Sequence, residues 1–248
     1  MDAFEVVCEI EPATRPDLTR VRHQIGVLST IATRFLIPDN HIGRATVSSV
    51  AVAHEVAQMG CRAVACINAR DRNLLGFRRD LLTAAAYGVD QFLFVYGDKP
   101  AAGDRTSGLT VRAMMEEARE SADFRVGVAA GLRPLVPWKR DADFVFAQVS
   151  YSVDTLLRWR ESAAVDCPVY AGVMVLASAD MARRLAGAIP DVEIPDRLVE
   201  QVVADRRAGV DAACEQVLAL RDSGAFDGVH LVPVARYREV AARLEREL

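Results

Sequence analysis

The stretch Cys66–Pro100, CINARDRNLLGFRRDLLTAAAYGVDQFLFVYGDKP, decides the fold. It begins in an apolar strand over Ala63–Asn68, passes through a polar turn and a leucine-rich helix, and ends in a second apolar strand over Phe92–Tyr96. Two parallel strands require a crossover connection of this kind, so the stretch predicts one complete βαβ unit. Asp98 then follows the carboxyl end of a strand, which is where α/β enzymes hold their chemistry.

The helix inside this unit is predicted from its caps and from its apolar spacing. Asn73 is placed to cap its first turn, and Gly88 is placed to end it. The apolar positions that suggest a buried face are Leu74, Leu75, Leu81, Leu82 and Ala85.

The same alternation extends over the whole chain. Apolar runs predict strands at Phe4–Glu11, Arg34–Pro38, Ala63–Asn68, Phe92–Tyr96, Arg125–Ala130, Phe144–Gln148, Pro168–Met174 and Gly228–Val234. Helical patterns separate most of them, and a long helical region over Asp196–Ser223 is expected to be divided by Gly209. Alternating strands and helices in this number predict an α/β fold, a (β/α)8 TIM barrel, as a single domain over residues 1–248.

One connection departs from the barrel pattern. Residues 131–143, GLRPLVPWKRDAD, hold two prolines and are too short for a full crossover helix. We therefore expect a shortened or missing helix between the fifth and sixth strands.

Composition excludes several classes of function. The net charge of -4 and the pI near 5.7 give no electrostatic footprint for nucleic acid. The sequence shows neither a membrane-length apolar run nor a signal peptide, so we expect a cytoplasmic protein without a membrane partner. Its five cysteines form no CxxC pair and are expected to be reduced and mostly buried.

The barrel interpretation predicts which side chains meet at the carboxyl ends of the strands. The polar residues at those ends are Glu9, Glu11, Asp39, Asn68, Asp98, Gln148 and Arg236. The four histidines have no metal-site spacing, and the chain lacks GxSxG, GxGxxG and GxxxxGK motifs. Carboxylates and an amide suit a neutral, nitrogen-rich heterocycle such as a pterin, and a buried carboxylic acid can serve as a general acid.

The wording of two segments, RDRNLLGFRRDLL and GVDQFLFVYGDKP, resembles the methylenetetrahydrofolate reductase family. Its Glu-x-x-Pro strand end is similar to Glu9–Pro12 and implies that Glu9 is the catalytic proton donor. Its Gly-Asp implies that Asp98 works in catalysis and binds the pterin edge, and its strand-end glutamine implies that Gln148 also contacts the pterin. Asp39 would line the substrate site, and Arg236 would bind the folate tail.

The resemblance also implies a cofactor region, where this chain departs from the family. Cys66 stands where a flavin-contacting histidine is usual, Tyr96 stands where some members have arginine, and the connection between strands five and six lacks about one helix. Asn68 and Ala130 are the other positions expected to contact the cofactor. We hypothesise that FAD is not used and that NADH or NADPH passes its hydride directly to the substrate.

Alternatives remain open at this point. Asp39 is also placed to cap a turn with Asn40, Arg236 is equally suited to a surface ion pair, and His230 is expected to be a packed core residue. The functional alternatives are an FAD-dependent reductase of methylenetetrahydrofolate, a deazaflavin-dependent pterin reductase and a non-catalytic folate-binding subunit. Methionine biosynthesis, one-carbon metabolism and association into homo-oligomers are further implications of the resemblance.

Overall fold

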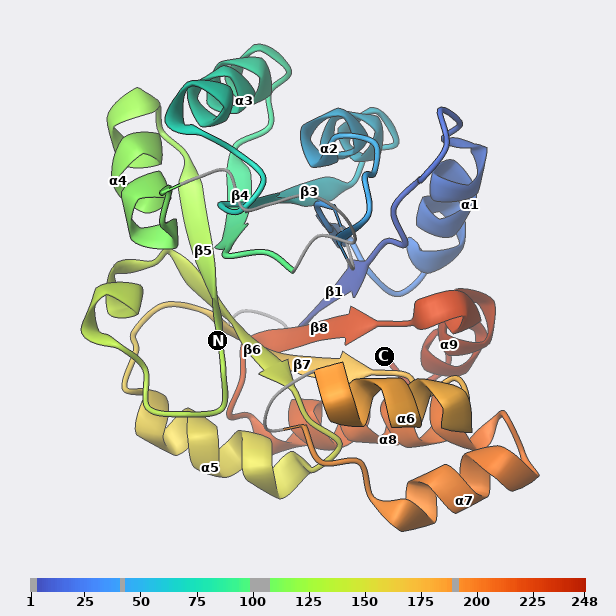
Figure 1. Cartoon of the computed structure of the whole chain (residues 1–248). Coiled ribbons are helices and arrows are strands. Elements are labelled where there is room, and N and C mark those ends of the chain that lie inside the picture. Colours follow the sequence, from blue (N-terminus) through green and yellow to red (C-terminus); the bar gives the residue numbers. More distant parts are fainter. Residues whose placement is uncertain (1–3, 41–42, 99–107, 189–191) are drawn as a thin grey trace.

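The eight strands form a closed, all-parallel barrel in chain order, as the sequence predicts (Figure 1). A computed structural model describes residues 4–40, 43–98, 108–188 and 192–248. The strands are β1 (Glu5–Glu9), β2 (Arg34–Ile37), β3 (Arg62–Asn68), β4 (Gln91–Val95), β5 (Arg125–Ala130), β6 (Phe144–Val149), β7 (Val169–Met174) and β8 (Gly228–Val232). β1 pairs with β8, which closes the sheet.

Helices surround the barrel as an outer ring (Figure 1). In chain order they are α1 (Thr19–Leu28), α2 (Ser49–Gln58), α3 (Leu74–Ala86), α4 (Val111–Ser121), α5 (Val153–Ala163), α6 (Ala179–Ala188), α7 (Asp196–Ala204), α8 (Ala208–Ser223) and α9 (Tyr237–Leu244). In the described part of the chain, no helix is both long and apolar enough to cross a membrane.

Alternation along the strands separates two apolar cores. Val6 and Cys8 of β1, and Ile10 just after it, belong to the large core between the strands and the helices. The interleaved residues face the barrel interior, whose apolar cluster consists of Val7, Leu36, Val64, Cys66, Leu93, Phe144, Phe146 and Tyr170. The interior is therefore packed with side chains and is not a pore.

Helix α3 confirms its predicted caps, but of the five apolar positions expected to be buried only Leu81 is buried. Asn73 accepts a hydrogen bond from the backbone N–H of Gly76 at 2.8 Å, and Gly88 has a φ of +68° at the other end. The buried face consists of Phe77, Leu81 and Ala84, whereas Leu74, Leu75 and Leu82 are 42%, 77% and 74% exposed. The prediction of the buried face was wrong because pairs of adjacent leucines fit the helical spacing of more than one face.

The connection between β5 and β6 is short, as predicted. It contains only the 3-10 helix η2 (Pro137–Asp141), whose Pro137 stands at its start. The segment is held in place from both sides: the indole N–H of Trp159 on α5 donates to the Arg133 carbonyl at 3.1 Å, and the Lys139 amine donates to the Ala129 carbonyl at 2.6 Å. Burial lowers the pKa of Lys139. The loop therefore packs over the end of β5.

The long helical region before β8 is divided, but the break lies before Gly209. Helix α7 ends at Ala204 and α8 begins at Ala208, so Gly209 lies in the first turn of the second helix. A Cβ on Gly209 would lie 2.0 Å from the Leu176 carbonyl oxygen. The glycine is thus needed for close packing of α8 against the chain after β7, and it does not interrupt the helix.

Candidate active site

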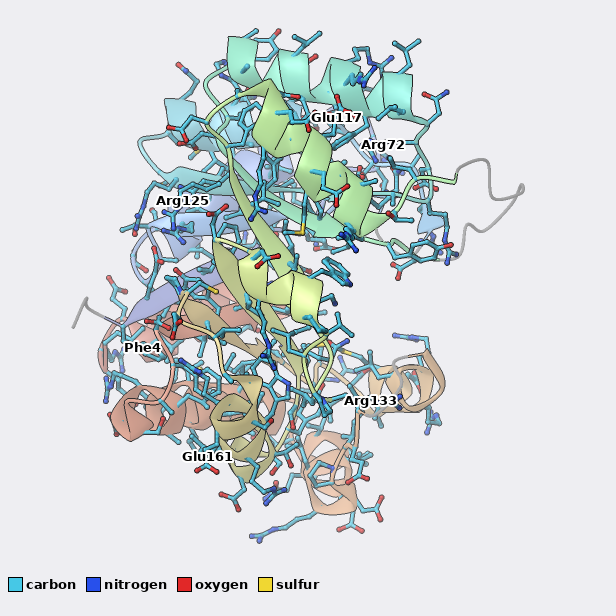
Figure 2. All side chains as sticks on the ribbon, turned by 90° about the vertical axis from the view of Figure 1, so that its left-hand side faces the viewer. Phe4, Arg72, Glu117, Arg125, Arg133 and Glu161 are labelled. Atoms are coloured by element: carbon cyan, nitrogen blue, oxygen red, sulfur yellow. The ribbon has the colours of Figure 1, made fainter. Side chains whose placement is uncertain are left out.

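The two ends of the barrel are chemically different, and the predicted site residues lie toward the carboxyl ends of the strands. Figure 2 views the barrel from the side: Phe4 and Arg125, near the starts of strands, lie on the left, and Arg72 and Arg133, which follow strands, lie on the right. At the amino-terminal end, Glu5 forms ion pairs with Arg34 and Arg62. The carboxyl end, here called the mouth, carries the candidate chemistry.

Glu9 ends β1 in the mouth, and its side chain is only 18% exposed. Its Oε2 lies 3.2 Å from Nε2 of His230 on β8, at ion-pair distance but without the angles of a hydrogen bond. The His230 ring stands edge-on to Phe146 at a centroid distance of 5.2 Å. Glu11, by contrast, is paired with Arg20 on the surface. The structure thus separates an enclosed glutamate from a rim glutamate two residues away.

His230 is a candidate functional residue that the sequence did not identify. It is buried, as predicted for a core histidine, but it lies in the barrel interior beside Glu9. Alternation on β8 and the pairing of Val7 with His230 place it there. Closure of the predicted barrel makes the first and last strands neighbours, and this could have indicated that His230 lies beside Glu9.

Asp39 is at the centre of a hydrogen-bonded network that joins β2, β3 and α3. Its Oδ2 accepts from the backbone N–H of Asn68 at 3.0 Å and from the Asn68 side-chain amide at 2.7 Å. Both terminal nitrogens of Arg72 also donate to its carboxylate, and Nε of Arg72 donates to Asp80 at 2.6 Å. The Asp39 side chain is 4% exposed. Both carboxylate oxygens of Asp39 therefore already accept hydrogen bonds from other residues of the protein.

The side-chain amide of Asn68 is also hydrogen-bonded within the protein at both of its polar atoms. Its amide nitrogen donates to Asp39, and its Oδ1 accepts from the backbone N–H of Asp71 at 2.9 Å. Gly97, at a φ of +94°, lies so close that a Cβ there would be 2.8 Å from the Asn68 Cβ. The Arg-Asp-Arg-Asn turn is therefore clamped to the ends of β2 and β4.

Cys66 is buried in the interior cluster, close to both carboxylates. Burial raises the pKa of its thiol, and the negative charges of Asp39 and then Glu9 raise it further. The structure therefore brings Cys66, Asp39 and Glu9 within electrostatic range of one another. A protonated, buried thiol is neither a nucleophile nor a metal ligand.

Gln148 is presented by an irregularity in β6. The β6–β7 register shifts between Phe146 and Val149, and Gln148 Oε1 accepts from the backbone N–H of Val149 at 2.9 Å. A Cβ on Gly172 of β7 would lie 2.6 Å from the Ala147 carbonyl oxygen and 2.7 Å from the Val149 nitrogen. Gly172 thus allows the bulge that aims Gln148, a device common beside active sites. Nε2 of Gln148 makes no hydrogen bond to any described residue.

The other predicted residues are less closely grouped. Asp98 is exposed after β4, and the Tyr96 ring lies 4.8 Å from the guanidinium carbon of Arg70. Arg236 pairs with Glu239 at 2.8 Å, as the alternative interpretation expected, in a turn where Val234 has a φ of +52°. Ala130 is packed in the outer core, so the structure does not bring it into the mouth. Within the described ranges, no cluster of side chains could hold a metal ion.

Comparison with known proteins gives one family. Residues 139–246 match the family model for methylenetetrahydrofolate reductase, a range that contains Gln148, His230 and Arg236 but not Glu9 or Asp98. No curated protein matches the chain.

Solved structures share the fold at low identity. An uncharacterized protein from Clostridium thermocellum that binds two copies of 5-methyl-5,6,7,8-tetrahydrofolic acid has a TM-score of 0.68 and 11% identity, over 99% of this chain and 96% of its own. A glycoside hydrolase family 17 β-1,3-glucanosyltransferase from Rhizomucor miehei has a TM-score of 0.56 and 12% identity, over 92% and 85%. Tryptophan synthase from M. tuberculosis has a TM-score of 0.52 and 15% identity, over 98% and 94%.

Proposed function

Because residues 139–246 match the family model for methylenetetrahydrofolate reductase, we propose that the protein reduces 5,10-methylenetetrahydrofolate to 5-methyltetrahydrofolate. Glu9 is the proposed proton donor, and NADH or NADPH is the proposed hydride donor. The observation that carries the proposal is the Glu9 carboxylate, enclosed in the mouth 3.2 Å from His230. A side chain that must hold and then deliver a proton needs such a partly enclosed position.

The reaction requires one proton and one hydride. Glu9 would protonate N10 of the substrate, the bond between N10 and the bridging carbon would break, and N10 would keep the electron pair. The carbon left on N5 is then an iminium, which accepts a hydride and becomes the methyl group. A nicotinamide supplies such a hydride when it is bound, and the residues of this chain hold the substrate and its proton.

Gln148 and Asp98 are the proposed contacts to the pterin edge. The amide nitrogen of Gln148 is a donor that the described residues leave unused, and the bulge in β6 fixes its position. Asp98 is an exposed carboxylate that can accept two N–H bonds from a 2-amino-4-oxo-pyrimidine. Arg236, which is 23% exposed, is the proposed partner for the carboxylates of the folate tail.

Asp39 is better suited to positioning than to substrate binding. Its oxygens are occupied by Asn68 and Arg72, so it would act by fixing the ends of β2 and β3 around the mouth. The buried Cys66 side chain would help to position these strand ends by packing in the barrel interior.

Three of the four positions expected to contact the cofactor offer no free polar side-chain group, Tyr96 being the fourth. The thiol of Cys66 is buried and neutral, both polar groups of the Asn68 amide bind the protein, and Ala130 faces the outer core. A flavin ring needs polar contacts that these three positions do not offer. Because the same positions are those expected to contact a nicotinamide, they do not decide between the two cofactors, and we derive no step through FAD.

The ligand of the Clostridium thermocellum protein agrees with this proposal. That protein binds 5-methyl-5,6,7,8-tetrahydrofolic acid, which is the product of the proposed reaction. A barrel of this fold therefore accommodates a reduced folate in that protein, which supports the proposal.

The test is a nicotinamide oxidation assay without added flavin. Purified protein is mixed with 5,10-methylenetetrahydrofolate and NADH, and in parallel with NADPH, and the loss of reduced-nicotinamide absorbance is followed. Turnover without flavin is expected. Turnover only after FAD or a reduced deazaflavin is added would replace the proposed hydride route. Folate binding without turnover under any donor would show a binding subunit and overturn the proposal.

A further inference from the structure

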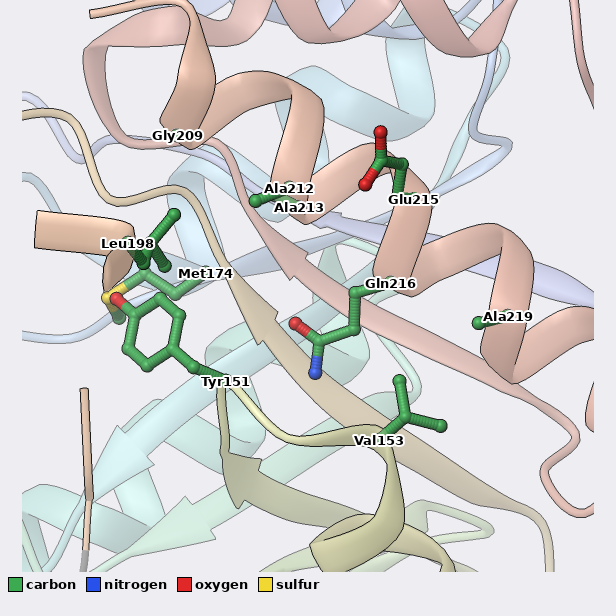
Figure 3. Close-up of a pocket in the computed structure, with 10 residues that line it drawn as sticks. All are labelled: Tyr151, Val153, Met174, Leu198, Gly209, Ala212, Ala213, Glu215, Gln216 and Ala219. Atoms are coloured by element: carbon green, nitrogen blue, oxygen red, sulfur yellow. The ribbon is translucent and has the colours of Figure 1, made fainter. Parts of the chain in front are cut away.

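A cavity lies beside the barrel, and neither Glu9 nor His230 lines it. It has a volume of about 280 Å³ and is lined by the loop after β6, the end of β7, α7 and α8 (Figure 3). Val153, Met174, Leu198 and Ala212 supply apolar surface, and Tyr151 and Gln216 supply polar atoms.

The hydroxyl group of Tyr151 is buried and has no hydrogen-bond partner among the described residues. Its ring packs against the small apolar cluster that includes Leu198 and Val202. Burial raises the pKa of Tyr151 to about 12, so the hydroxyl keeps its proton near neutral pH and remains a donor. A buried tyrosine hydroxyl normally finds a partner, so an unpaired one on a residue that lines a cavity indicates that a bound molecule provides it.

Gln216 presents an acceptor on the other wall. Its Nε2 donates to the Ser150 carbonyl at 2.7 Å, which fixes the orientation of the amide. Figure 3 shows its amide oxygen turned toward the Tyr151 side of the cavity. No described residue donates a hydrogen bond to this oxygen, although Gln216 is 8% exposed. The cavity therefore offers one donor and one acceptor over an apolar lining.

The electrostatics of the lining disfavour an anion. Glu215 is the one ionisable side chain besides Tyr151 among the described residues that line the cavity, and no lysine or arginine accompanies it there. A purely apolar occupant would leave both the hydroxyl and the amide oxygen unpaired, which costs binding free energy.

We propose that this cavity is a binding site for a small, flat, uncharged heterocycle with one N–H donor and one ring-nitrogen acceptor. The Tyr151 hydroxyl donates to the ring nitrogen, and the N–H of the ligand donates to Gln216 Oε1. The volume suits one or two fused rings, below the range of larger cofactor sites. This site is independent of the reductase reaction.

Benzimidazole, which has these two groups, is the probe. It is titrated into full-length protein carrying ¹³C-methyl methionine, because Met174 lines the cavity while Met114 and Met115 are buried on α4. Of the six methionines, Met174 lines the cavity, so a saturable shift of its methyl signal is expected, whereas the signals of Met114 and Met115 stay unchanged. Indene, which has the same shape without the nitrogens, is expected to bind at least tenfold more weakly.

Two variants make the test specific. Tyr151→Phe removes only the unpaired hydroxyl, so it should fold normally and bind benzimidazole about tenfold more weakly. Ala212→Leu should fill the cavity and abolish the Met174 shift, with thermal unfolding confirming that the variant is folded. Absence of a saturable Met174 shift in the unaltered protein, or equal affinity in Tyr151→Phe, would overturn the proposal.

Discussion

Nε2 of His230 and Oε2 of Glu9 lie 3.2 Å apart, although the two residues belong to the last and the first strand of the sheet. The pairing of β8 with β1 creates this contact, with Val7 opposite His230. The His230 imidazole packs edge-on against the Phe146 ring. The imidazole therefore limits the positions that the Glu9 carboxylate can adopt. The proposed proton donor is therefore positioned where β1 pairs with β8 and closes the barrel.

Replacing Glu9 with glutamine should remove the proton donor and preserve the shape of the mouth. We expect kcat for methylenetetrahydrofolate reduction to fall by about 10²-fold or more, with the Kd for folate changed little. Glu11→Gln is the matched control, because Glu11 is exposed and paired with Arg20 at the surface. Full activity of Glu9→Gln would remove Glu9 from its proposed role.

Changing His230 should affect turnover more than substrate binding. His230→Phe removes the polar neighbour of Glu9, and we expect kcat to fall about tenfold while KM changes less than threefold. His230→Gln keeps a polar group in the same place and should recover part of the loss. Steady-state kinetics on both variants tests this, and a change in KM alone would show that His230 acts on the substrate.

Adding a methyl group at Gly172 should disturb the bulge that presents Gln148. The new Cβ would lie 2.6 Å from the Ala147 carbonyl oxygen, so backbone must move. We expect Gly172→Ala to destabilise the fold by about 1 to 3 kcal/mol and to weaken folate binding. Gly26→Ala on α1 is the control, because a Cβ there meets nothing within 4 Å. Urea unfolding and folate titration distinguish the two, and equal stability would contradict the bulge argument.

Removing Arg72 should destabilise the turn that follows β3. The Asp39 carboxylate, with a side chain 4% exposed, would lose its cation, and we expect Arg72→Ala to cost about 3 kcal/mol. Arg112→Ala breaks an exposed pair with Glu116 and should change stability by less than about 0.5 kcal/mol. Chemical denaturation of both variants measures the difference, and similar values would show that the network contributes little.

Stability should fall at alkaline pH because of buried thiols. Burial raises the pKa values of Cys8, Cys66 and Cys214 above the ordinary thiol value of 9.0, so the folded state keeps protons that the unfolded state loses. The stabilising effect is complete below about pH 9 and is lost as the pH rises further. Unfolding measured across this range should show the decline, and Cys66→Ala should reduce its slope.

Thiol labelling checks the same burial independently. Cys61 and Cys167 are partly exposed, and a thiol reagent at neutral pH should modify them first. The three buried cysteines should react only on unfolding. Rapid labelling of Cys66 in the native protein would contradict its placement.

Local patterns along the chain were enough to predict the barrel. Strand positions, the Asn73 cap and the short connection before β6 follow from apolar alternation, side-chain capping and two prolines, all of which act over a few residues. The buried face of α3 did not follow, because Leu75 and Leu82 look like core residues until the neighbouring elements are placed.

The sequence by itself determined that Glu9, Asp39 and Gln148 stand at strand ends, since strand periodicity fixes that position. Only the tertiary structure decided what each side chain meets: Glu9 faces His230, Asp39 is occupied by Asn68 and Arg72, and a bulge beside Gly172 aims Gln148. The physical reason is that these contacts join neighbouring strands whose residues lie far apart in the sequence. They depend on barrel closure and register, which no local pattern along the chain encodes.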